Sequence, residues 1–291
     1  MGQTMTTIHK DLPELLCIGH MCHDRVDAGY RLGGTVSYAS LMSAHLGVRT
    51  ALMTSVGEDF KYWQSIHDQS IQTYNLRADR TTEFENIYSD TGRTQFMHER
   101  AQTILAVDIP DELHQVPTVK LCLIADELDS TVVPLFSNSF VAASIQGWLR
   151  QRDPESGLIT PKALDYDLLS GIDMIFLSLD DIDGDESELD KLRQAIDTVI
   201  VTDGPNPVQI YRDKAVLEMP VFPVEEIDPT GAGDIFAASF LVQYRRTQSL
   251  LLAGAYAHSA ASYVVEHQGI FLAPVADIES RYASYIDQFL S

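Results

Sequence analysis

The hydrophobic positions of the chain fall into short runs that predict the strands of a buried sheet. These runs lie at residues 15–18, 50–56, 121–125, 140–144, 174–177 and 199–202. Helix-length segments separate the later runs, and this alternation is typical of parallel strands joined by crossover helices. Because helices cover both faces of such a sheet, its strands are continuously apolar rather than alternating.

Segments bounded by glycines or turn residues predict helices over 35–46, 59–69, 234–246, 249–266 and 275–289. The pattern changes in the segment 81–102. Two β segments, 83–88 and 93–98, are joined there through Asp90-Thr91-Gly92, which is a hairpin signal. The sequence therefore predicts one α/β domain over residues 1–291, with small β segments near 20–32 and 81–102.

The chain is strongly acidic. Its 291 residues include 20 Lys and Arg against 42 Asp and Glu, which gives a net charge of −22 at pH 7. This charge argues against a nucleic-acid partner, because phosphate contacts need clustered Lys and Arg. A polyphosphate ligand would have to be held locally, by backbone N–H groups and a metal ion rather than by a basic field.

Two stretches, 130–149 and 247–265, lack charged residues for about the length that spans a membrane. Polar residues interrupt both of them, so we interpret them as core of a soluble protein. The N-terminus shows no secretory signal pattern. The three cysteines, Cys17, Cys22 and Cys122, form no disulfide framework. We therefore expect a cytoplasmic protein with no membrane partner.

The sharpest motif is Asp228-Pro229-Thr230-Gly231-Ala232-Gly233-Asp234, which leads directly into the predicted helix at 234–246. Its two glycines let the backbone approach a ligand closely, and a helix start presents unpaired N–H groups at the positive end of its dipole. The motif thus predicts an anion site that needs no Lys or Arg. Asp234 could accept a proton from an attacking hydroxyl. A glycine turn at an ordinary helix start is the alternative interpretation.

Further motifs accompany this one along the chain. They are Gly19-His20-Met21-Cys22-His23-Asp24, Gly33-Gly34, Val56-Gly57-Glu58-Asp59, Val201-Thr202-Asp203-Gly204 and Ala257-His258-Ser259-Ala260-Ala261. Together they make the chain resemble the ribokinase-like (PfkB) family of carbohydrate and nucleoside kinases over almost its whole length. The segment Ile145-Gln146-Gly147-Trp148-Leu149-Arg150 is similar to a motif of the myo-inositol kinase branch.

The resemblance implies an ATP-dependent kinase with the ribokinase-like three-layer α/β fold, a central mostly parallel sheet and a small β lid. It implies that Asp234 is the general base and that the N–H groups of Gly231, Ala232 and Gly233 stabilise the transferring phosphoryl group. The acceptor would be a small polyol or sugar, such as myo-inositol, and a homodimer through the lid is plausible. The residues that would bind this acceptor are Asp24, Gly33, Gly34 and Tyr38. Those on the ATP side are Thr202, Gly204, Thr230 and His258, while Asp181 would organise Mg²⁺ through water.

Three positions depart from the family pattern. Tyr38 stands where the family often has an asparagine that binds a sugar hydroxyl, which implies an acceptor of different shape. The metal-side motif Asn-x-x-Glu is represented by Ser178 and Asp181. Pro207 replaces a glycine on the nucleotide side and removes one backbone N–H.

Several alternatives stay open in the sequence. The cluster of Cys17, His20, Cys22, His23 and Asp24 could be mistaken for a zinc site, but its spacing is not that of paired zinc ligands. Packed histidines, or a histidine near the substrate, are the alternatives. Within the same family, a nucleoside kinase would need an aromatic slot for the base in the lid. A non-catalytic sugar or nucleotide sensor is the alternative of a different class.

The arginines beside the β segments and one buried histidine also have two interpretations. Arg93 and Arg100 could reach the phosphates from a closing lid, or be solvated surface charges, and we favour the second. His258 lies on an apolar helix, where it is either a core histidine or one at the edge of the nucleotide.

Overall fold

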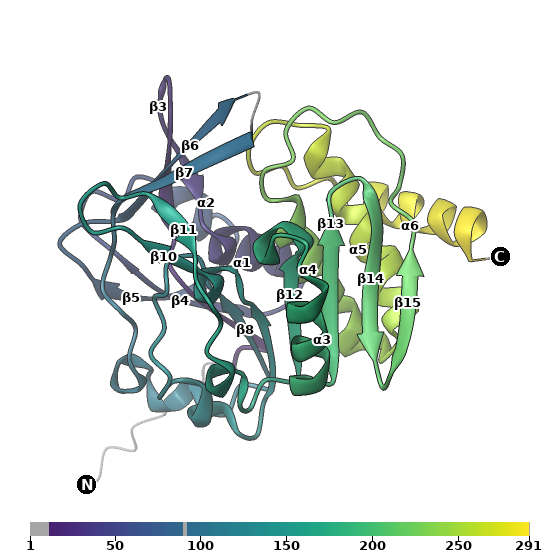
Figure 1. Ribbon diagram of the computed structural model, residues 1–291, viewed down its shortest axis with the longest axis horizontal. Helices are drawn as coiled ribbons and strands as arrows, with labels where there is room; N and C mark the ends of the chain where they lie inside the picture. Colours follow the sequence, from purple (N-terminus) through teal and green to yellow (C-terminus); the bar gives the residue numbers. More distant parts are fainter. Residues whose placement is uncertain (1–11, 90–91, 291) are drawn as a thin grey trace, which may run out of the picture.

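The computed structural model describes residues 12–89 and 92–290, without the side chains of residues 88–93. Its main sheet has nine strands. They are β1 (Leu15–Ile18), β4 (Thr50–Val56), β5 (Gln72–Arg77), β8 (Thr118–Cys122), β9 (Phe140–Ser144), β12 (Met174–Ser178), β13 (Thr198–Asp203), β14 (Asn206–Arg212) and β15 (Ala215–Met219). Their order in the sheet is β15-β14-β13-β12-β9-β8-β1-β4-β5. The strands from β13 to β5 run parallel, and β14 and β15 add an antiparallel edge (Figure 1).

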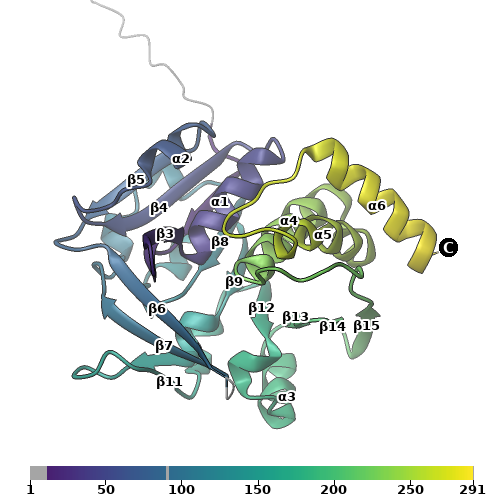
Figure 2. The same cartoon turned by 90° about the horizontal axis from the view of Figure 1, so that it is seen from above.

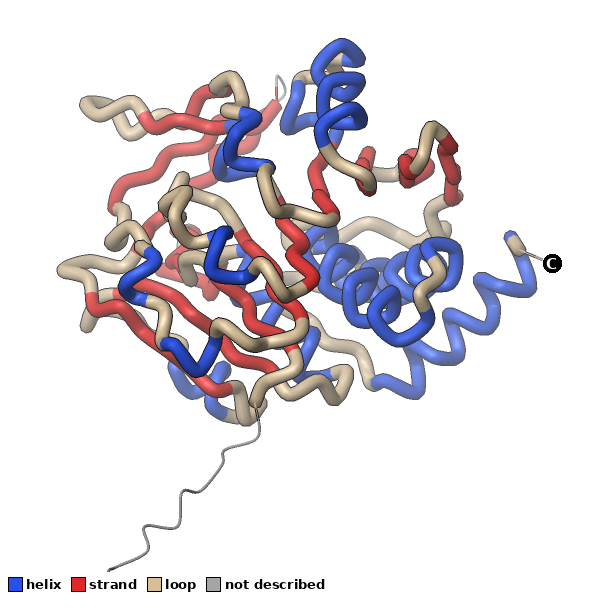
Figure 3. The backbone as a smooth tube through the Cα atoms, turned by 90° about the horizontal axis from the view of Figure 1, so that it is seen from below, coloured by secondary structure: helices blue, strands red, loops and turns tan. Residues whose placement is uncertain are grey.

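The helices are α1 (Thr35–His45), α2 (Trp63–His67), α3 (Glu186–Ala195), α4 (Ala232–Thr247), α5 (Leu250–Val265) and α6 (Val275–Phe289). Figure 2 shows α1, α4, α5 and α6 on one face of the main sheet and α3 on the other. Loops and short 3-10 turns complete the second face (Figure 3). Helix α5 is apolar almost all round because it packs between α4 and α6, whereas α3 buries only Leu189 and Leu192.

A second sheet contains β2 (Cys22–Val26), β3 (Gly29–Gly33), β6 (Thr82–Ser89) and β7 (Gly92–Glu99), in the order β3-β2-β6-β7. Only Gly19, His20 and Met21 separate it from the end of β1, so it lies at the carboxyl ends of the parallel strands (Figure 1). The hairpin of β10 (Arg150–Arg152) and β11 (Ile159–Pro161) lies against β7 through a bridge between Phe96 and Leu158. Ligands of open α/β sheets bind at this edge.

The predicted α/β class with a mostly parallel sheet is confirmed. The helix expected over 59–69 is wrong at its start, since α2 begins only at Trp63. The Asp59 carboxylate instead accepts the backbone N–H (3.0 Å) and the hydroxyl (2.9 Å) of Thr81, which holds a turn. Most expected crossover helices are short 3-10 turns or loops, and the sequence did not predict β5 or the β14–β15 hairpin. Asp90 and Thr91 of the expected turn lie outside the described residues.

The longest helices of the described part, α4 and α5, are too short or too polar to cross a lipid bilayer, and this holds for every helix between residues 12 and 290 that the structure describes.

Candidate active site

The start of α4 is formed by the glycine motif at 228–234. Gly231 caps the helix with a left-handed φ of 82°. A Cβ at this position would lie 2.0 Å from Cε1 of Tyr38, so only glycine fits. The N–H of Ala232 donates to the carbonyl of Pro229 (3.1 Å), and that of Thr230 donates to Oδ1 of Asp228 (3.0 Å). Of the three predicted amide donors, Ala232 is therefore already used within the turn.

Asp234 lies in the first turn of α4 and is largely withdrawn from solvent. Burial raises the pKa of its carboxyl from 3.8 to about 6. A hydrogen bond from Thr35, at the start of α1, and the positive charge of Lys120 oppose this rise, while Asp181 and Asp24 add to it. A carboxyl with this pKa is ionised at neutral pH and remains basic enough to take a proton.

Asp24 is the second half-buried carboxylate of the site. It lies on β2 directly over Gly33 of β3, where a Cβ would be 2.2 Å from its Oδ2. The Sγ of Cys22 donates to its Oδ1 (3.5 Å). Burial raises the pKa of Asp24 to about 6, and the Cys22 contact and the charge of Arg31 lower it. The close approach of β2 and β3 therefore explains why glycine stands at position 33.

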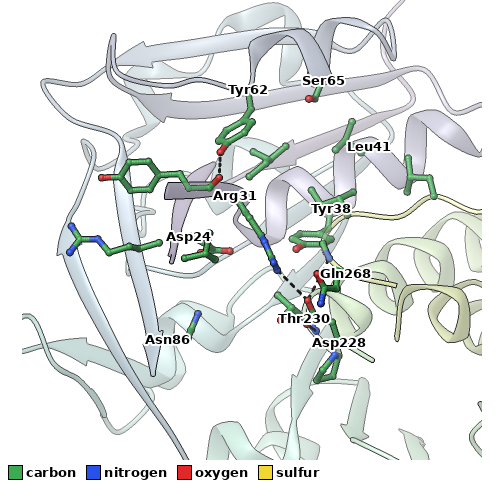
Figure 4. A pocket seen from close by; sticks show the side chains of 18 of the residues that line it. Asp24, Arg31, Tyr38, Leu41, Tyr62, Ser65, Asn86, Asp228, Thr230 and Gln268 are labelled. Carbon is green, nitrogen blue, oxygen red and sulfur yellow. Dashed lines mark hydrogen bonds and ion pairs between the residues drawn. The ribbon is translucent and has the colours of Figure 1, made fainter. Parts of the chain in front are cut away.

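A pocket of about 1010 Å³ opens beside these groups. Figure 4 shows Asp24 on one side of it and Thr230 with Asp228 on the other, with the side chain of Arg31 between them and the ring of Tyr38 beside Thr230. Tyr38 is buried, and its ring lies against Gly231. Asp234 itself does not line this pocket, but after burial the charges of Asp24 and Asp234 both raise the pKa of the Tyr38 hydroxyl.

The wall of the pocket at the second sheet is aromatic, which no pattern in the sequence indicated. Tyr30 of β3 and Tyr62 line it, and the Tyr62 hydroxyl donates to the Tyr30 carbonyl (2.5 Å). His23 packs behind Tyr30, with its ring 5.0 Å from that of Tyr30 and stacked 5.6 Å from Phe60. These residues come from separate segments, so only the folded chain brings them together.

Arg31 joins the two sides of the pocket. Its guanidinium on β3 pairs with Oδ2 of Asp228 at 3.5 Å, next to the start of α4 (Figure 4). The side chain of Arg31 is 46% exposed, so the pair is weak. Arg25, the other cation of this wall, is instead paired with Glu83 on β6.

Asp181 does not offer a free carboxylate to Mg²⁺. Its Oδ1 accepts from Nε2 of Gln146 (2.9 Å) and from the guanidinium of Arg150 (3.1 Å), and its Oδ2 accepts from the N–H of Ser178 (2.9 Å). The side chain is 5% exposed. These contacts occupy the groups that a directly bound metal would need, and among the described residues no three metal-ligating side chains form a cluster.

The residues expected on the ATP side are only partly brought together. Thr230 lines the pocket, but Thr202 and Gly204 lie at the end of β13 and do not. His258 is 4% exposed within the helical layer, between Phe236 (5.1 Å) and Tyr285 (5.5 Å). Burial lowers its pKa to about 4. Its ring therefore faces the core of the helices rather than the pocket.

The histidines of the N-terminal cluster are packed groups. His20 is fully buried, with Nε2 at 2.8 Å from the Gln102 carbonyl and Nδ1 at 2.8 Å from the Thr82 hydroxyl. Arg100 donates to the carbonyls of Ala125 (2.9 Å) and Asp126 (2.5 Å), so it ties loops together rather than reaching the pocket. The Arg93 side chain lies outside the described part of the structure.

Sequence reasoning also missed Lys120, a buried cation in the centre of β8. The available signal was a single lysine inside the apolar run Thr118–Cys122, where a solvated charge is not expected. The aromatic wall had no comparable signal, because tyrosines are common in loops and edge strands.

A family model described as the pfkB family carbohydrate kinase matches residues 25–274. The chain is 28% identical over 252 residues to a nucleoside kinase of Methanothermobacter thermautotrophicus, across 81% of this chain and 79% of that protein. It is 27% identical over 277 residues to an inositol 3-kinase of Arabidopsis thaliana, across 88% of this chain and 74% of that protein.

Solved structures share the fold. A pyrophosphate-dependent kinase of the ribokinase family, complexed with a pyrophosphate analog and myo-inositol, matches with a TM-score of 0.76 at 22% identity. This match covers 91% of this chain and 99% of the other. A ribokinase of Arabidopsis thaliana complexed with ribose and ATP matches with a TM-score of 0.73 at 15% identity, over 94% and 99% of the two chains. At such identities the likeness is one of fold alone.

Proposed function

Because this chain belongs to the PfkB family of carbohydrate kinases, we propose that it transfers a phosphoryl group from ATP to a hydroxyl of a small polyol or sugar. The observation that carries this proposal is that two half-buried carboxylates, Asp24 and Asp234, both act on the Tyr38 hydroxyl and raise its pKa, while the Tyr38 ring packs against Gly231 at the start of α4. One carboxylate can hold acceptor hydroxyls, and the other can take the proton of the hydroxyl that reacts.

In this proposal Asp24 accepts hydrogen bonds from the hydroxyls of the acceptor. Gly33 and Gly34 carry no side chains, so they leave room for these hydroxyls. Tyr38 forms part of the pocket wall next to Gly231, at the start of the helix that carries Asp234. The acceptor oxygen attacks the terminal phosphorus of the donor as Asp234 takes its proton, and the bond from phosphorus to the leaving phosphate oxygen breaks. The remaining polyol or sugar is held in the pocket, which limits its motion.

The negative charge on the transferring group is stabilised by backbone rather than by side-chain cations. The Gly231 and Gly233 amides make no hydrogen bond to another described residue, so both are available at the positive end of the α4 dipole. We assign the Ala232 amide to the turn instead. Mg²⁺ would enter with the phosphates of the donor, because Asp181 is already engaged by Arg150 and Gln146.

The sheet of β2, β3, β6 and β7 serves as the lid in this proposal. It carries Asp24, Tyr30 and Arg31 over the pocket, and the Arg31–Asp228 pair reaches the start of α4. A closed lid would keep water away from the phosphoryl group and so limit hydrolysis of the donor.

One observation favours a second acceptor class. The pocket, at about 1010 Å³, lies at the upper end of the ~300–1,000 Å³ typical of small-molecule sites, and Tyr30 and Tyr62 give it an aromatic wall. A nucleoside would place its base against these rings and its sugar hydroxyl toward Asp234. A nucleoside kinase and an inositol kinase are both among the relatives of the chain.

The test is a panel of acceptors with two donors. The purified chain is incubated with ATP or pyrophosphate and with myo-inositol, hexoses, pentoses or nucleosides, and the phosphorylated product is measured directly. We expect ATP-dependent product with a polyol or sugar. Product only with nucleosides would establish the second acceptor class, and product only with pyrophosphate would correct the donor. Absence of product with every acceptor and both donors would contradict the proposal.

A further inference from the structure

The centre of the main sheet contains a charge that the proposed reaction has not yet used. Lys120 lies in the middle of β8, its side chain is 1% exposed, and its Nζ donates to the Ser144 hydroxyl at 2.8 Å. The ammonium lies 4.1 Å from the centroid of the Phe176 ring. A buried ammonium with one hydrogen-bond acceptor and one aromatic face costs free energy unless an anion compensates it.

The position of Lys120 identifies that anion. Ser144 is the last residue of β9, so the bond to it directs Nζ toward the carboxyl edge of the sheet, where α4 begins. Cys17 of β1 is paired with Lys120 across the sheet, and Cys122 lies on the same face of β8. The Cys122 thiol remains neutral, because burial raises its pKa. The Phe176 ring under the ammonium packs against Phe240 of α4, with 5.6 Å between the ring centroids, so Lys120 lies on the face of the sheet that α4 covers. The carboxylate that raises the pKa of Lys120 is Asp234, in the first turn of this helix.

We propose that Lys120 is a positioning residue whose buried charge compensates Asp234 from below and keeps this carboxylate ionised in a site that burial would otherwise neutralise. This proposal rests on the proposed function only in that it takes Asp234 to be the catalytic base. Lys120 touches neither acceptor nor donor, and it acts through Asp234 alone.

Of the other groups around Asp234, two carboxylates act in the opposite direction to Lys120, and the hydrogen bond from Thr35 acts in the same direction. Asp181, from the 3-10 turn at Leu179–Ile182, and Asp24, from β2, both raise the pKa of Asp234. From α1, Thr35 donates a hydrogen bond to Asp234, and Tyr38 presents a hydroxyl whose own pKa is raised. Cys22 of β2 is a neutral thiol for the same reason. Lys120 is thus the cation that lowers the pKa of Asp234, whereas the two neighbouring carboxylates raise it.

The charge of Lys120 sets the direction in which the pKa of Asp234 changes when the lysine is removed. A positive charge favours the ionised carboxylate, so removal of Lys120 raises the pKa of Asp234 above about 6. The interaction is reciprocal, so removal of the Asp234 charge lowers the pKa of Lys120 below about 8. Above that pH the wild-type lysine loses its proton, and the support for Asp234 ends.

The direct experiment is a carboxyl titration of Lys120→Met by NMR with ¹³C-labelled aspartate, in which Asp234 is assigned by its absence in Asp234→Asn. We expect the Asp234 midpoint to rise by about one pH unit or more. Lys191→Met is the matched control, because Lys191 is exposed on α3 and its removal changes the net charge equally. That variant should leave the midpoint unchanged, and Lys120→Arg should restore it.

An unchanged Asp234 midpoint in folded Lys120→Met would overturn the proposal. If Lys120→Met does not fold, the reciprocal titration replaces it, with ¹⁵N-labelled lysine in Asp234→Asn. An unchanged Lys120 midpoint there would overturn the proposal as well. Neither titration needs turnover, so both outcomes can be separated from a failure of the proposed function. Where turnover is present, the acid limb of kcat/KM in Lys120→Met should move upward by the same amount.

Discussion

The start of α4 and the wall of the second sheet border the same pocket, but they present different parts of the polypeptide to it. At the start of α4, Asp228, Pro229 and Thr230 line the pocket, and the groups available directly after them in the chain are the Gly231 and Gly233 amides, the helix dipole and the Asp234 carboxylate. The opposite wall presents side chains, namely Asp24, Tyr30 and Arg31. The first region needs no cation to receive a phosphoryl group, which is how a chain of net charge −22 could bind one.

This difference predicts which kinetic constant, kcat or KM, each substitution changes. Changes at the start of α4 alter the groups that act when the phosphoryl group moves, so they should reduce kcat. Changes in the wall alter groups that hold the acceptor before and during the reaction, so they should mainly raise KM.

Asp234→Asn should have the largest effect. The amide keeps the shape of the side chain but cannot take the proton, so kcat should fall about 10²- to 10⁴-fold with KM within a few-fold of wild type. Steady-state kinetics with the acceptor found in the panel measure this. An unchanged kcat would remove Asp234 from the role of base.

Gly231→Ala should have the next largest effect. Its Cβ would meet the Tyr38 ring at 2.0 Å, and the φ of 82° is strained for alanine. The displaced turn should reduce kcat about 10²- to 10³-fold. Gly184→Ala is the control, since Gly184 also has a positive φ (68°) but nothing lies within 4 Å of its Cβ. Only stability should change there, and an equal loss of kcat in both variants would contradict the assignment of Gly231 to the anion site.

Asp24→Asn tests whether the wall of the second sheet holds the acceptor. Loss of a charged hydrogen-bond acceptor costs about 1.5–3 kcal/mol, so kcat/KM should fall about 10- to 100-fold, mostly through KM. The measurement is a full acceptor titration at saturating donor. A fall confined to kcat would place Asp24 among the reacting groups and remove the distinction between the two regions.

The same variant tests the electrostatics of the wall. The pKa of Asp24 is raised from 3.8 to about 6, so the folded chain holds this proton more tightly than the unfolded chain. This contribution to stability is full below about pH 4 and is lost as the pH rises through about 6. Asp24→Asn should therefore have a higher melting temperature than wild type at about pH 7.5 and an equal one at about pH 4. A lower melting temperature at both values would show that the charged form stabilises the fold.

Tyr62→Phe should have the smallest effect. It removes the hydrogen bond to the Tyr30 carbonyl (2.5 Å) but keeps the aromatic wall. The loss of one neutral hydrogen bond predicts about a 2- to 10-fold increase in KM, without a change in kcat. Kinetics at saturating donor check this. A change of 100-fold would mean that the Tyr62 hydroxyl contacts the acceptor itself.

The two regions also differ in how far they could be predicted from the sequence. The α4 motif is local: a glycine needed at Gly231, a helix start and Asp234 all lie within a few residues, so spacing alone predicts their placement. The wall depends on contacts between distant segments, such as Tyr62 with Tyr30. Nothing local indicates that these residues meet.

The surroundings of two other predicted site residues were unpredictable for the same physical reason. Asp181 was predicted to organise Mg²⁺ through water, and the sequence does not indicate its hydrogen bonds from Gln146 and Arg150, which come from another turn. His258 was recognised on an apolar helix, and α6 contributes the Tyr285 ring that covers it. The α/β class could be predicted because apolar runs report burial directly, whereas the partner of a buried polar group is set by tertiary packing.

The division between the two regions is tested most directly by measuring acceptor binding and turnover in the same two variants. Calorimetry gives the Kd of the acceptor, and rapid mixing gives the rate of a single turnover. We expect Asp234→Asn to bind the acceptor with a Kd close to wild type and to transfer the phosphoryl group at least about 100-fold more slowly. Asp24→Asn should bind at least about 10-fold more weakly and react at a near wild-type rate once saturated. If both variants lose binding and rate together, the assignment of separate roles to the two carboxylates is wrong.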